Sequence, residues 1–280
     1  MKPISHAAIT VTKPGGFKLS KVNTQATGAF SNEEEAKLKI SRDIAKLADL
    51  QERLFAEGKK GLLIIFQGMD TSGKDSTIKH VMTGLNPQGC KVTSFKRPSE
   101  EENRHDYLRR HSLALPGVGN IGIFNRSYYE EVTTVRVHGD FKNRKIWNQR
   151  FEEICAFEKY LTHNNYVIRK VFLHISEEEQ RQRLLRRIDD PNKHWKFDWS
   201  DVTEREYWRE YQIAYEEAIA NTASAFAPWI VIPADHKWCA RMAMSHVLVE
   251  TLESLRPRYP TSTAENATKL RRARKLLLKK

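Results

Sequence analysis

Apolar positions along the chain follow two different periods, and segments with the two periods alternate. From 32 to 58, leucine and isoleucine recur every three or four residues, which is the spacing of one helix face. The apolar run at 62–66 has the length of a buried strand. Further strands are predicted at 91–95, 121–124, 166–175 and 229–232, and further helices at 74–83, 99–113, 126–137, 142–163, 203–221 and 237–255. Another helix is expected from Ser176 until Pro191 interrupts it. This alternation predicts an α/β fold with a parallel sheet flanked by helices.

The two ends of the chain lack this alternation. Residues 1–30 have few periodic apolar positions and contain Pro14-Gly-Gly16, so we expect an irregular N-terminal arm. Ser31 with Glu34 three residues later resembles a capping box, which predicts the start of the first helix. The pattern therefore indicates one domain over 31–258, followed by a basic C-terminal tail over 259–280.

Much of the positive charge lies in that tail. The chain has 47 Lys and Arg against 35 Asp and Glu, a net charge of +12. Residues 269–280 hold seven of the basic residues and no acid, so without them the balance is 40 against 35, or +5. A basic tail is compatible with nucleic-acid or membrane contact and equally with a solvated helical extension, and we do not expect nucleic-acid binding from it. The modestly basic body suits a polyanionic small substrate.

The composition also bears on the compartment. Apolar residues make up 40% of the chain, which is typical of a globular protein. The apolar run at 62–66 is far shorter than the roughly 20 residues that span a bilayer, and the N-terminus has no signal-peptide pattern. Three cysteines without a C-x-x-C pair suit a reducing compartment. We therefore expect a cytoplasmic protein without a membrane segment.

A glycine-rich loop joins the first strand to the next helix. Its sequence, Gly68-Met-Asp-Thr-Ser-Gly-Lys74, has the Gly-x-x-x-x-Gly-Lys pattern of a P-loop in the required strand–loop–helix context. Backbone N–H groups and the helix N-terminus would hold a phosphate, and Lys74 would bridge the terminal phosphates. The alternative is a glycine-rich turn with a surface lysine. The residues expected around the phosphate are Gly68, Met69, Thr71, Ser72, Gly73, Asp75, Ser76 and Thr77.

Two acidic residues distinguish this loop from the usual P-loop. Asp75 stands after Lys74, where a Ser or Thr is usual. Asp70 lies inside the loop, where a carboxylate would repel phosphates unless it holds Mg²⁺ or orients the acceptor. The alternative is a turn residue that bonds its own backbone. We therefore expect Asp70 to be a catalytic residue in one of these two roles.

Polar residues follow the strand at 121–124. P-loop enzymes usually offer an acid to the metal at the end of this strand, and here the position is the neutral Asn125. Glu130 lies one helical turn beyond Arg126 and can supply the missing carboxylate. Arg126 is placed to contact a transferring phosphate with two hydrogen bonds. The alternative is a surface ion pair between Arg126 and Glu130.

A basic stretch from 181 to 196 carries six Lys and Arg against two acids. Arg183 and Arg187 are four residues apart and share one helix face, which ends at Pro191. A helical lid over about 183–202 that closes on phosphates and excludes water would need this composition. The alternative is an exposed amphipathic helix and turn. The lid residues expected to contact phosphates are Arg183, Arg187, Lys193 and Lys196.

Together these motifs resemble the family-2 polyphosphate kinases. The matching stretches are Phe66-Gln-Gly-Met-Asp-Thr-Ser-Gly-Lys-Asp75, Asn86-Pro-Gln-Gly89, Ser94-Phe-Lys-Arg-Pro98, His105-Asp106, Phe124-Asn-Arg-Ser-Tyr-Tyr-Glu130, Leu173-His-Ile-Ser176, Asp190-Pro-Asn-Lys-His-Trp-Lys-Phe197, Ala227-Pro-Trp229 and Pro233-Ala-Asp-His-Lys-Trp238. They run in order over about residues 30–260. The resemblance implies a P-loop kinase-like core with a helical lid, Mg²⁺ dependence, and a homo-oligomer, either a dimer or a tetramer. It implies transfer of the terminal phosphoryl group of inorganic polyphosphate to AMP and ADP, giving ADP and ATP.

The resemblance also implies roles for individual residues. Many members have Asp-Arg-Ser-Trp-Tyr-Asn where this chain has Asn125-Arg-Ser-Tyr-Tyr-Glu130, a version similar to the subgroup usually called class III, which uses nucleoside mono- and diphosphates. The expected catalytic residues are Asp70, Lys74, Asn125, Arg126 and Glu130, with Asp70 and Glu130 as the metal ligands. The expected nucleotide contacts are Phe95, Lys96, Arg97, His105 and Asp106.

Two other functions share some of these features. An ATP-dependent nucleoside monophosphate kinase, similar to thymidylate kinase, would also have the P-loop, the acid within it and the lid. A non-catalytic P-loop protein that binds polyanions would account for the basic tail. The ordered family motifs favour the polyphosphate kinase over both.

Overall fold

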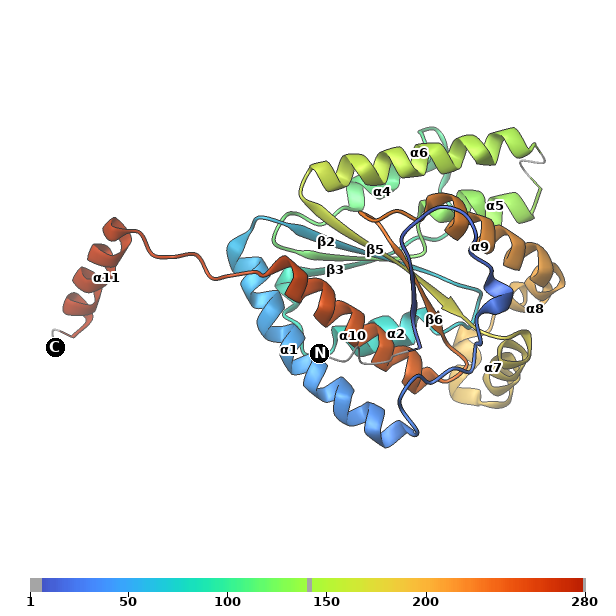
Figure 1. Ribbon diagram of the computed structural model, residues 1–280, viewed down its shortest axis with the longest axis horizontal. Coiled ribbons are helices and arrows are strands. Elements are labelled where there is room, and N and C mark those ends of the chain that lie inside the picture. Colours follow the sequence, from blue (N-terminus) through green and yellow to red (C-terminus); the bar gives the residue numbers. More distant parts are fainter. Residues whose placement is uncertain (1–6, 140–142, 279–280) are drawn as a thin grey trace.

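The computed structural model describes residues 7–139 and 143–278 (Figure 1). The strands are β1 (Ile9–Val11), β2 (Gly61–Gln67), β3 (Cys90–Ser94), β4 (Ile121–Asn125), β5 (Tyr166–His174) and β6 (Trp229–Pro233). The longer helices are α1 (Glu33–Glu57), α2 (Lys74–Met82), α6 (Arg144–His163), α7 (Glu177–Asp189), α9 (Trp208–Thr222), α10 (Lys237–Leu255) and α11 (Ala264–Leu277). The short helices are α3 (Glu100–Asn103), α4 (Arg109–Ala114), α5 (Thr134–Val137) and α8 (Ser200–Thr203).

The strands form one sheet in the order β1-β6-β5-β2-β4-β3. All neighbouring strands from β6 to β3 are parallel, and β1 is antiparallel to β6. The chain passes from β2 to the outer strand β3, returns to β4, and then crosses to β5 on the other side of β2. In α/β sheets, a reversal of this kind is where a ligand-binding crevice is expected, here at the carboxyl end of β2.

Helices cover both faces of the sheet, as predicted. Figure 1 shows α1, α2 and α10 on one face and α4, α6 and α9 on the other. Along β2, Leu62 and Ile64 pack in the core beneath α1 and α10, whereas Leu63 and Ile65 pack in the core on the opposite face. Every residue of β2 is buried, which explains its continuous apolar sequence.

Two predicted helices are interrupted. Residues 99–113 form α3 and α4 as separate helices, because the Asp106 carboxylate accepts hydrogen bonds from the backbone at Leu108 and Arg109 and starts a new one. Residues 126–137 begin with the 3-10 turn Tyr128–Val132 before α5, because Arg126 adopts a left-handed backbone conformation with φ of 64°.

The first helix also starts one residue later than predicted. Asn32 is its N-cap, and its side chain accepts a hydrogen bond from the backbone N–H of Glu35. The backbone N–H of Ser31 donates to the Glu35 carboxylate, so the reciprocal pair is shifted by one position. Gly58 ends the helix in the left-handed conformation, with φ of 63°.

The N-terminal arm is more ordered than the irregular segment predicted for 1–30. β1 pairs with β6, and Leu19 and Val22 are buried against the main core. The hydroxyl of Thr24 donates to the Asp235 carboxylate at 2.7 Å. The pattern missed this strand because only three residues pair, too few to show an alternation.

The tail contains α11, which agrees with the helical extension considered for it. In Figure 1 this helix stands apart from the domain, beyond the ends of α1 and α10. None of the helices within the described ranges is long and apolar enough to cross a membrane.

Candidate active site

The P-loop lies in the crevice at the carboxyl end of β2. Gly68 has a φ of 147°, and a Cβ there would lie 2.8 Å from the carbonyl oxygen of Leu173, so only glycine fits. Gly73 and Thr71 also have positive φ values, of 103° and 60°. These conformations turn the loop around the N-terminus of α2, which begins at Lys74. The predicted P-loop geometry is therefore present.

Lys74 is buried within this loop. Its Nζ donates to the carbonyl oxygens of Gly68 at 2.7 Å and Met69 at 3.2 Å. Burial, with a further contribution from the nearby Arg126 guanidinium, lowers the pKa of Lys74 to about 8. A bound phosphate would replace these carbonyl partners with a charged one and favour the protonated form.

Arg126 joins the two predicted metal-binding acids. Its guanidinium forms an ion pair with Asp70 and a second one with Glu130 at 3.3 Å. Its backbone N–H bonds to the Phe66 carbonyl oxygen at 3.0 Å, which ties β4 to β2. Glu130, and then Asp70, hold the pKa of Arg126 above its usual range despite burial. The surface ion pair considered for Arg126 and Glu130 is thus present, but in the crevice and with Asp70 as a third member.

Asn125 lies beside the start of α2. Its Nδ2 donates to the Asp75 carboxylate at 2.7 Å and to the Ser94 hydroxyl at 3.4 Å. These bonds bring the ends of β3 and β4 next to the P-loop. The oxygen of the Asn125 amide is buried and has no hydrogen-bond partner, and the same holds for the hydroxyls of Thr71 and Ser72. Buried polar atoms without partners are uncommon, so these three oxygens are candidates to contact a ligand.

The donor set fits Mg²⁺ bound together with phosphate. The described residues contain no group of three or more acidic, His or Cys side chains that could enclose a metal ion. Mg²⁺ usually takes only one or two protein carboxylates and completes its shell with water and substrate phosphates. Asp70 and Glu130, on either side of Arg126, would supply those carboxylates, and the unpartnered oxygen of Asn125 lies at the end of β4.

The remaining predicted phosphate residues surround the loop. The hydroxyl of Ser76 donates to the carbonyl oxygen of Gly73 at 3.2 Å, and the Thr77 backbone N–H donates to the same oxygen at 2.9 Å. Met69 is buried in the core on the face of α6 and α9, so its side chain anchors the loop. Only its backbone is then available to a phosphate.

Arg183 contradicts the expectation of a lid side chain that is free to bind polyphosphate. The residue is 5% exposed. One N–H donates to Glu179, two donate to the carbonyl oxygens of Thr71 and Ser72 at 2.9 Å, and two donate to those of Ala234 and Asp235. All five guanidinium donors are therefore used within the protein. Arg183 fastens the P-loop to the end of β6.

The other lid residues lie further out. Arg187 donates to the Lys196 carbonyl oxygen and forms an ion pair with Asp201, so it braces the lid internally. Lys193 pairs with Asp190 at 2.6 Å, and Lys196 lies over the Trp195 ring. The exposed amphipathic helix considered as the alternative thus fits much of the observed contact pattern.

The helix that leads into the lid contacts the P-loop acid directly, because the Gln180 side chain donates to the backbone carbonyl oxygen of Asp70 at 3.1 Å. Burial, followed by the charge of Asp70, raises the pKa of Asp201. Arg187 holds Asp201 by an ion pair.

The predicted nucleotide contacts differ in their exposure. Phe95 is a core residue, with its ring 4.9 Å from that of Phe124, so a direct contact between Phe95 and a nucleotide is ruled out in this conformation. Asp106 is exposed but uses its carboxylate to start α4. The other three, Lys96, Arg97 and His105, are exposed.

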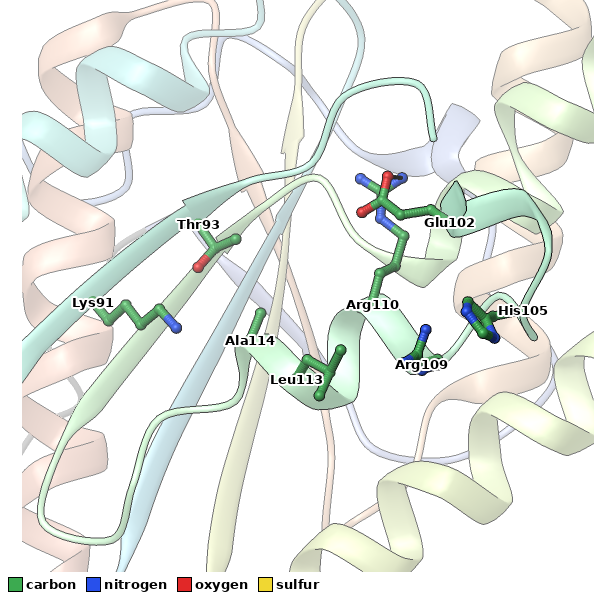
Figure 2. A pocket seen from close by; sticks show the side chains of 8 residues that line it. All are labelled: Lys91, Thr93, Glu102, His105, Arg109, Arg110, Leu113 and Ala114. Carbon is green, nitrogen blue, oxygen red and sulfur yellow. Dashed lines mark ion pairs between the residues drawn. The ribbon is translucent and has the colours of Figure 1, made fainter. Parts of the chain in front are cut away.

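A cavity of about 290 Å³ lies along the outer strand of the sheet (Figure 2). Lys91 and Thr93 of β3 form one wall, and α4 forms another. His105 lies at one end, and Arg110 forms an ion pair with Glu102 at 3.3 Å. Of the predicted nucleotide contacts, His105 alone lines this cavity.

Two glutamines of the site were not predicted from the sequence. Gln67 is fully buried, and its amide nitrogen donates to Glu130 at 3.0 Å while its oxygen accepts from Ser127. Gln180 donates to the carbonyl oxygen of Asp70 at 3.1 Å and accepts from Arg205. A polar residue at the end of the all-apolar β2 was the available signal for Gln67. The sequence held no such signal for Gln180.

A buried polar network, also not predicted, supports the segment that carries Arg126. The hydroxyls of Tyr128 and Tyr129 donate to the Glu158 carboxylate at 3.0 and 2.9 Å. Glu158 pairs with Lys170 of β5 at 2.7 Å, and both side chains are fully buried. The network joins α6, β5 and the turn after β4.

Comparisons with known proteins agree with this geometry. A family model described as Polyphosphate kinase 2 matches residues 30–260. An ADP-polyphosphate phosphotransferase of Rhodopseudomonas palustris is 43% identical over 272 residues, which cover 93% of this chain and 94% of the relative. An AMP/ADP-polyphosphate phosphotransferase of Meiothermus ruber is 44% identical over 251 residues, covering 89% and 94%.

A solved structure is similar over nearly the whole chain. The crystal structure of Polyphosphate Kinase 2 from Arthrobacter aurescens TC1 matches with a TM-score of 0.89 and 39% sequence identity, and the match covers 96% of each chain. The predicted α/β kinase-like fold is thereby confirmed. The P-loop, the family model and the relatives together show that this chain belongs to the polyphosphate kinase 2 family of phosphotransferases.

Proposed function

We propose that this enzyme transfers the terminal phosphoryl group of inorganic polyphosphate to AMP and ADP, giving ADP and ATP. The observation that supports this most directly is the charged cluster of Asp70, Lys74, Arg126 and Glu130 at the mouth of the P-loop. Of the two relatives described above, one is named for ADP and the other for both AMP and ADP.

The chemistry requires positioning and charge neutralisation more than covalent catalysis. Lys74 and Arg126 would neutralise the terminal phosphates, and the backbone N–H groups of the loop would hold them in line with the acceptor. The acceptor phosphate is ionised near neutral pH and needs no strong base. Asp70 and Glu130 would hold Mg²⁺, which supplies further charge neutralisation when bound.

The acceptor nucleotide would lie on the side of β3. The bonds from Asn125 to Ser94 and Asp75 place the end of β3 beside the P-loop, and the cavity of Figure 2 adjoins that strand. His105, together with the exposed Lys96 and Arg97, remains our proposed nucleotide contact. Lys193 and Lys196 remain the proposed polyphosphate contacts on the lid.

We also propose that the enzyme assembles as a dimer or tetramer in the cytoplasm. Apolar side chains are exposed on the outer strand and on the helix beside it: Val92 of β3 is 47% exposed and Leu113 of α4 is 72% exposed. The three cysteines are free thiols, as expected in a reducing compartment. Light scattering of the purified protein measures the assembly.

The decisive experiment is incubation with AMP, Mg²⁺ and polyphosphate in the absence of ATP. We expect ADP to form first and ATP after it. The Lys74→Ala variant, which retains the loop backbone, should form neither while its circular dichroism spectrum stays unchanged. Phosphorylation of AMP by ATP alone, without any by polyphosphate, would instead identify a nucleoside monophosphate kinase.

A further inference from the structure

The tail helix α11 presents basic side chains away from the domain. Within the described residues, the side-chain hydrogen bonds and ion pairs of α11 stay within the helix and its cap. Lys269 pairs with Glu265, whereas Arg272, Arg274 and Lys275 have no acidic partner there. Arg271 contacts only the Thr268 hydroxyl. These positive charges are therefore available to an external anion.

Three of the basic residues of α11 share one side of the helix. Arg271, Arg272 and Lys275 have the spacing of a single helical face, while Leu270 and Leu277 are seven residues apart on another. No acid occurs from 269 to the end of the chain. A short cationic face of this kind suits a flexible linear polyanion, because such a chain can follow the helix and contact several side chains at once.

We propose that α11 is a second polyphosphate-binding site, which captures long chains for the active site. The inference rests on polyphosphate being the substrate of the P-loop. Inorganic polyphosphate carries a negative charge along its whole length, so a part distant from the reacting end can bind α11 while the end lies in the P-loop. Two contacts on one chain raise the local concentration of its reactive end.

The position of α11 makes this capture depend on chain length. The P-loop is at the carboxyl end of the parallel strands. α10 runs back along the sheet after β6, so the segment that leads to α11 starts near the opposite end (Figure 1). β2 alone has seven residues and is about 23 Å long. A chain of a few phosphates cannot extend past the sheet, and only long chains can contact both sites.

The test compares tetraphosphate with long-chain polyphosphate as the phosphoryl donor. In the variant with Arg271→Gln, Arg272→Gln and Lys275→Gln together, we expect the KM for long chains to rise about tenfold at low salt. The KM for tetraphosphate and both kcat values should stay within twofold of the wild type. Adding salt should remove the difference between wild type and variant, because exposed charges are screened.

A control variant removes the same charge elsewhere. Lys13→Gln, Lys59→Gln and Lys159→Gln together neutralise three exposed lysines outside the tail, and should leave the KM for long chains unchanged. An equal rise in this control, or an equal rise for tetraphosphate in the tail variant, would show a general charge effect and overturn the proposal.

Direct binding separates this proposal from the proposed function. Long-chain polyphosphate should bind the wild type more tightly than the tail variant without any nucleotide, as measured by titration calorimetry. If neither tetraphosphate nor long-chain polyphosphate supports transfer in the wild type, the proposed function fails, whatever the tail does. If the tail variant loses binding to anionic lipid vesicles but not to polyphosphate, α11 is a membrane contact and the capture proposal is wrong.

Discussion

Lys74 combines burial with a need for positive charge. With its pKa lowered to about 8, the free enzyme loses the Lys74 charge as the pH rises through 8, well below the usual lysine value of 10.5. The protonated lysine binds phosphate, so the KM for polyphosphate should be constant below pH 8. Above that it should rise, approaching tenfold per pH unit. KM measured from pH 7 to 9.5 at constant ionic strength checks this.

A nearby lysine provides the control for this profile. Lys79 lies on the same helix but is exposed, so Lys79→Gln should retain the change near pH 8. A KM that stays constant to pH 9.5 in the wild type would contradict the assignment to Lys74.

Glu130 is predicted to set which acceptor is used. By the family resemblance given in the sequence analysis, Asn125 and Glu130 stand where other members are expected to have Asp and Asn, so the carboxylate would be moved from the strand end to the following turn. The phosphate chain of AMP is one phosphate shorter than that of ADP. The carboxylate must therefore act on a terminal phosphate at two different positions in the site. We expect Glu130→Asn to reduce AMP phosphorylation about tenfold more than ADP phosphorylation. Rates with saturating polyphosphate and Mg²⁺ give the comparison.

The contacts of Glu130 define the opposing outcome. Its carboxylate also accepts from the Thr134 hydroxyl at 2.7 Å and holds Arg126. If Glu130 serves only to hold Arg126, the two acceptors should lose the same fraction of activity. Thr134→Val, which removes one bond and keeps the carboxylate, should leave the AMP to ADP ratio unchanged.

For single residues, the sequence predicted where functional side chains lie better than it predicted which groups they contact. Gly-x-x-x-x-Gly-Lys is a local pattern, so the P-loop and the place of Lys74 followed from it. Four of the five hydrogen bonds of Arg183 reach carbonyl oxygens more than fifty residues away in the sequence, and no local pattern encodes such contacts. The sequence did not reveal the burial of Phe95 for the same reason, because the ring of Phe124 that it packs against belongs to β4, a distant part of the sequence.

Among the elements, α7 links the lid to the P-loop through Arg183. Because its role depends on five directed bonds, Arg183→Lys should be nearly as damaging as Arg183→Ala. Each should reduce kcat about 100-fold through displacement of the loop and lower the free energy of unfolding by about 1–3 kcal/mol. Steady-state kinetics and urea unfolding measure the two effects.

Arg181 offers a matched control on the same helix. It is exposed and bonds only Glu178 within the described contacts. Arg181→Lys should therefore change neither kcat nor the free energy of unfolding appreciably. If Arg183→Lys keeps nearly full kcat and raises only the KM for polyphosphate, the residue binds substrate through its charge, and the positioning role is wrong.

The elements also show where periodicity is informative. Long segments such as α1 and α6 bury one face against the sheet, and this burial maintains the pattern that predicted them. The prediction of continuous helices at 99–113 and 126–137 was wrong, because side-chain caps and a residue in the left-handed conformation divide these segments. Such interruptions depend on the conformation of single residues, which an average over a window does not detect.

For the molecule as a whole, the ion pair between Lys170 and Glu158 connects the core to the site. Replacing Lys170 by Met leaves a buried carboxylate and two tyrosine hydroxyls around it, and should lower the free energy of unfolding by about 3–5 kcal/mol. Lys159→Met on the exposed side of α6 is the control and should change it by less than about 0.5 kcal/mol. Urea unfolding followed by fluorescence measures both.

The double variant Lys170→Met and Glu158→Leu tests the cause. If the loss arises from an uncompensated buried charge, removing that charge should recover part of the stability. A double variant less stable than Lys170→Met would mean that the network contributes mainly through its geometry.

Arg126 also affects the order in which the site fills. The guanidinium neutralises one of the two carboxylates that flank it, so Asp70, Arg126 and Glu130 together carry one net negative charge. A free cation must displace Arg126 to reach both acids, and a free polyanion meets the charge of those acids. A bound cation would neutralise the two acids and release the Arg126 guanidinium, which could then bind phosphate. A bound phosphate would in turn draw Arg126 away from the acids and leave them free for the cation. We therefore expect cation and polyanion binding to be cooperative, so that the donor would bind as a metal salt.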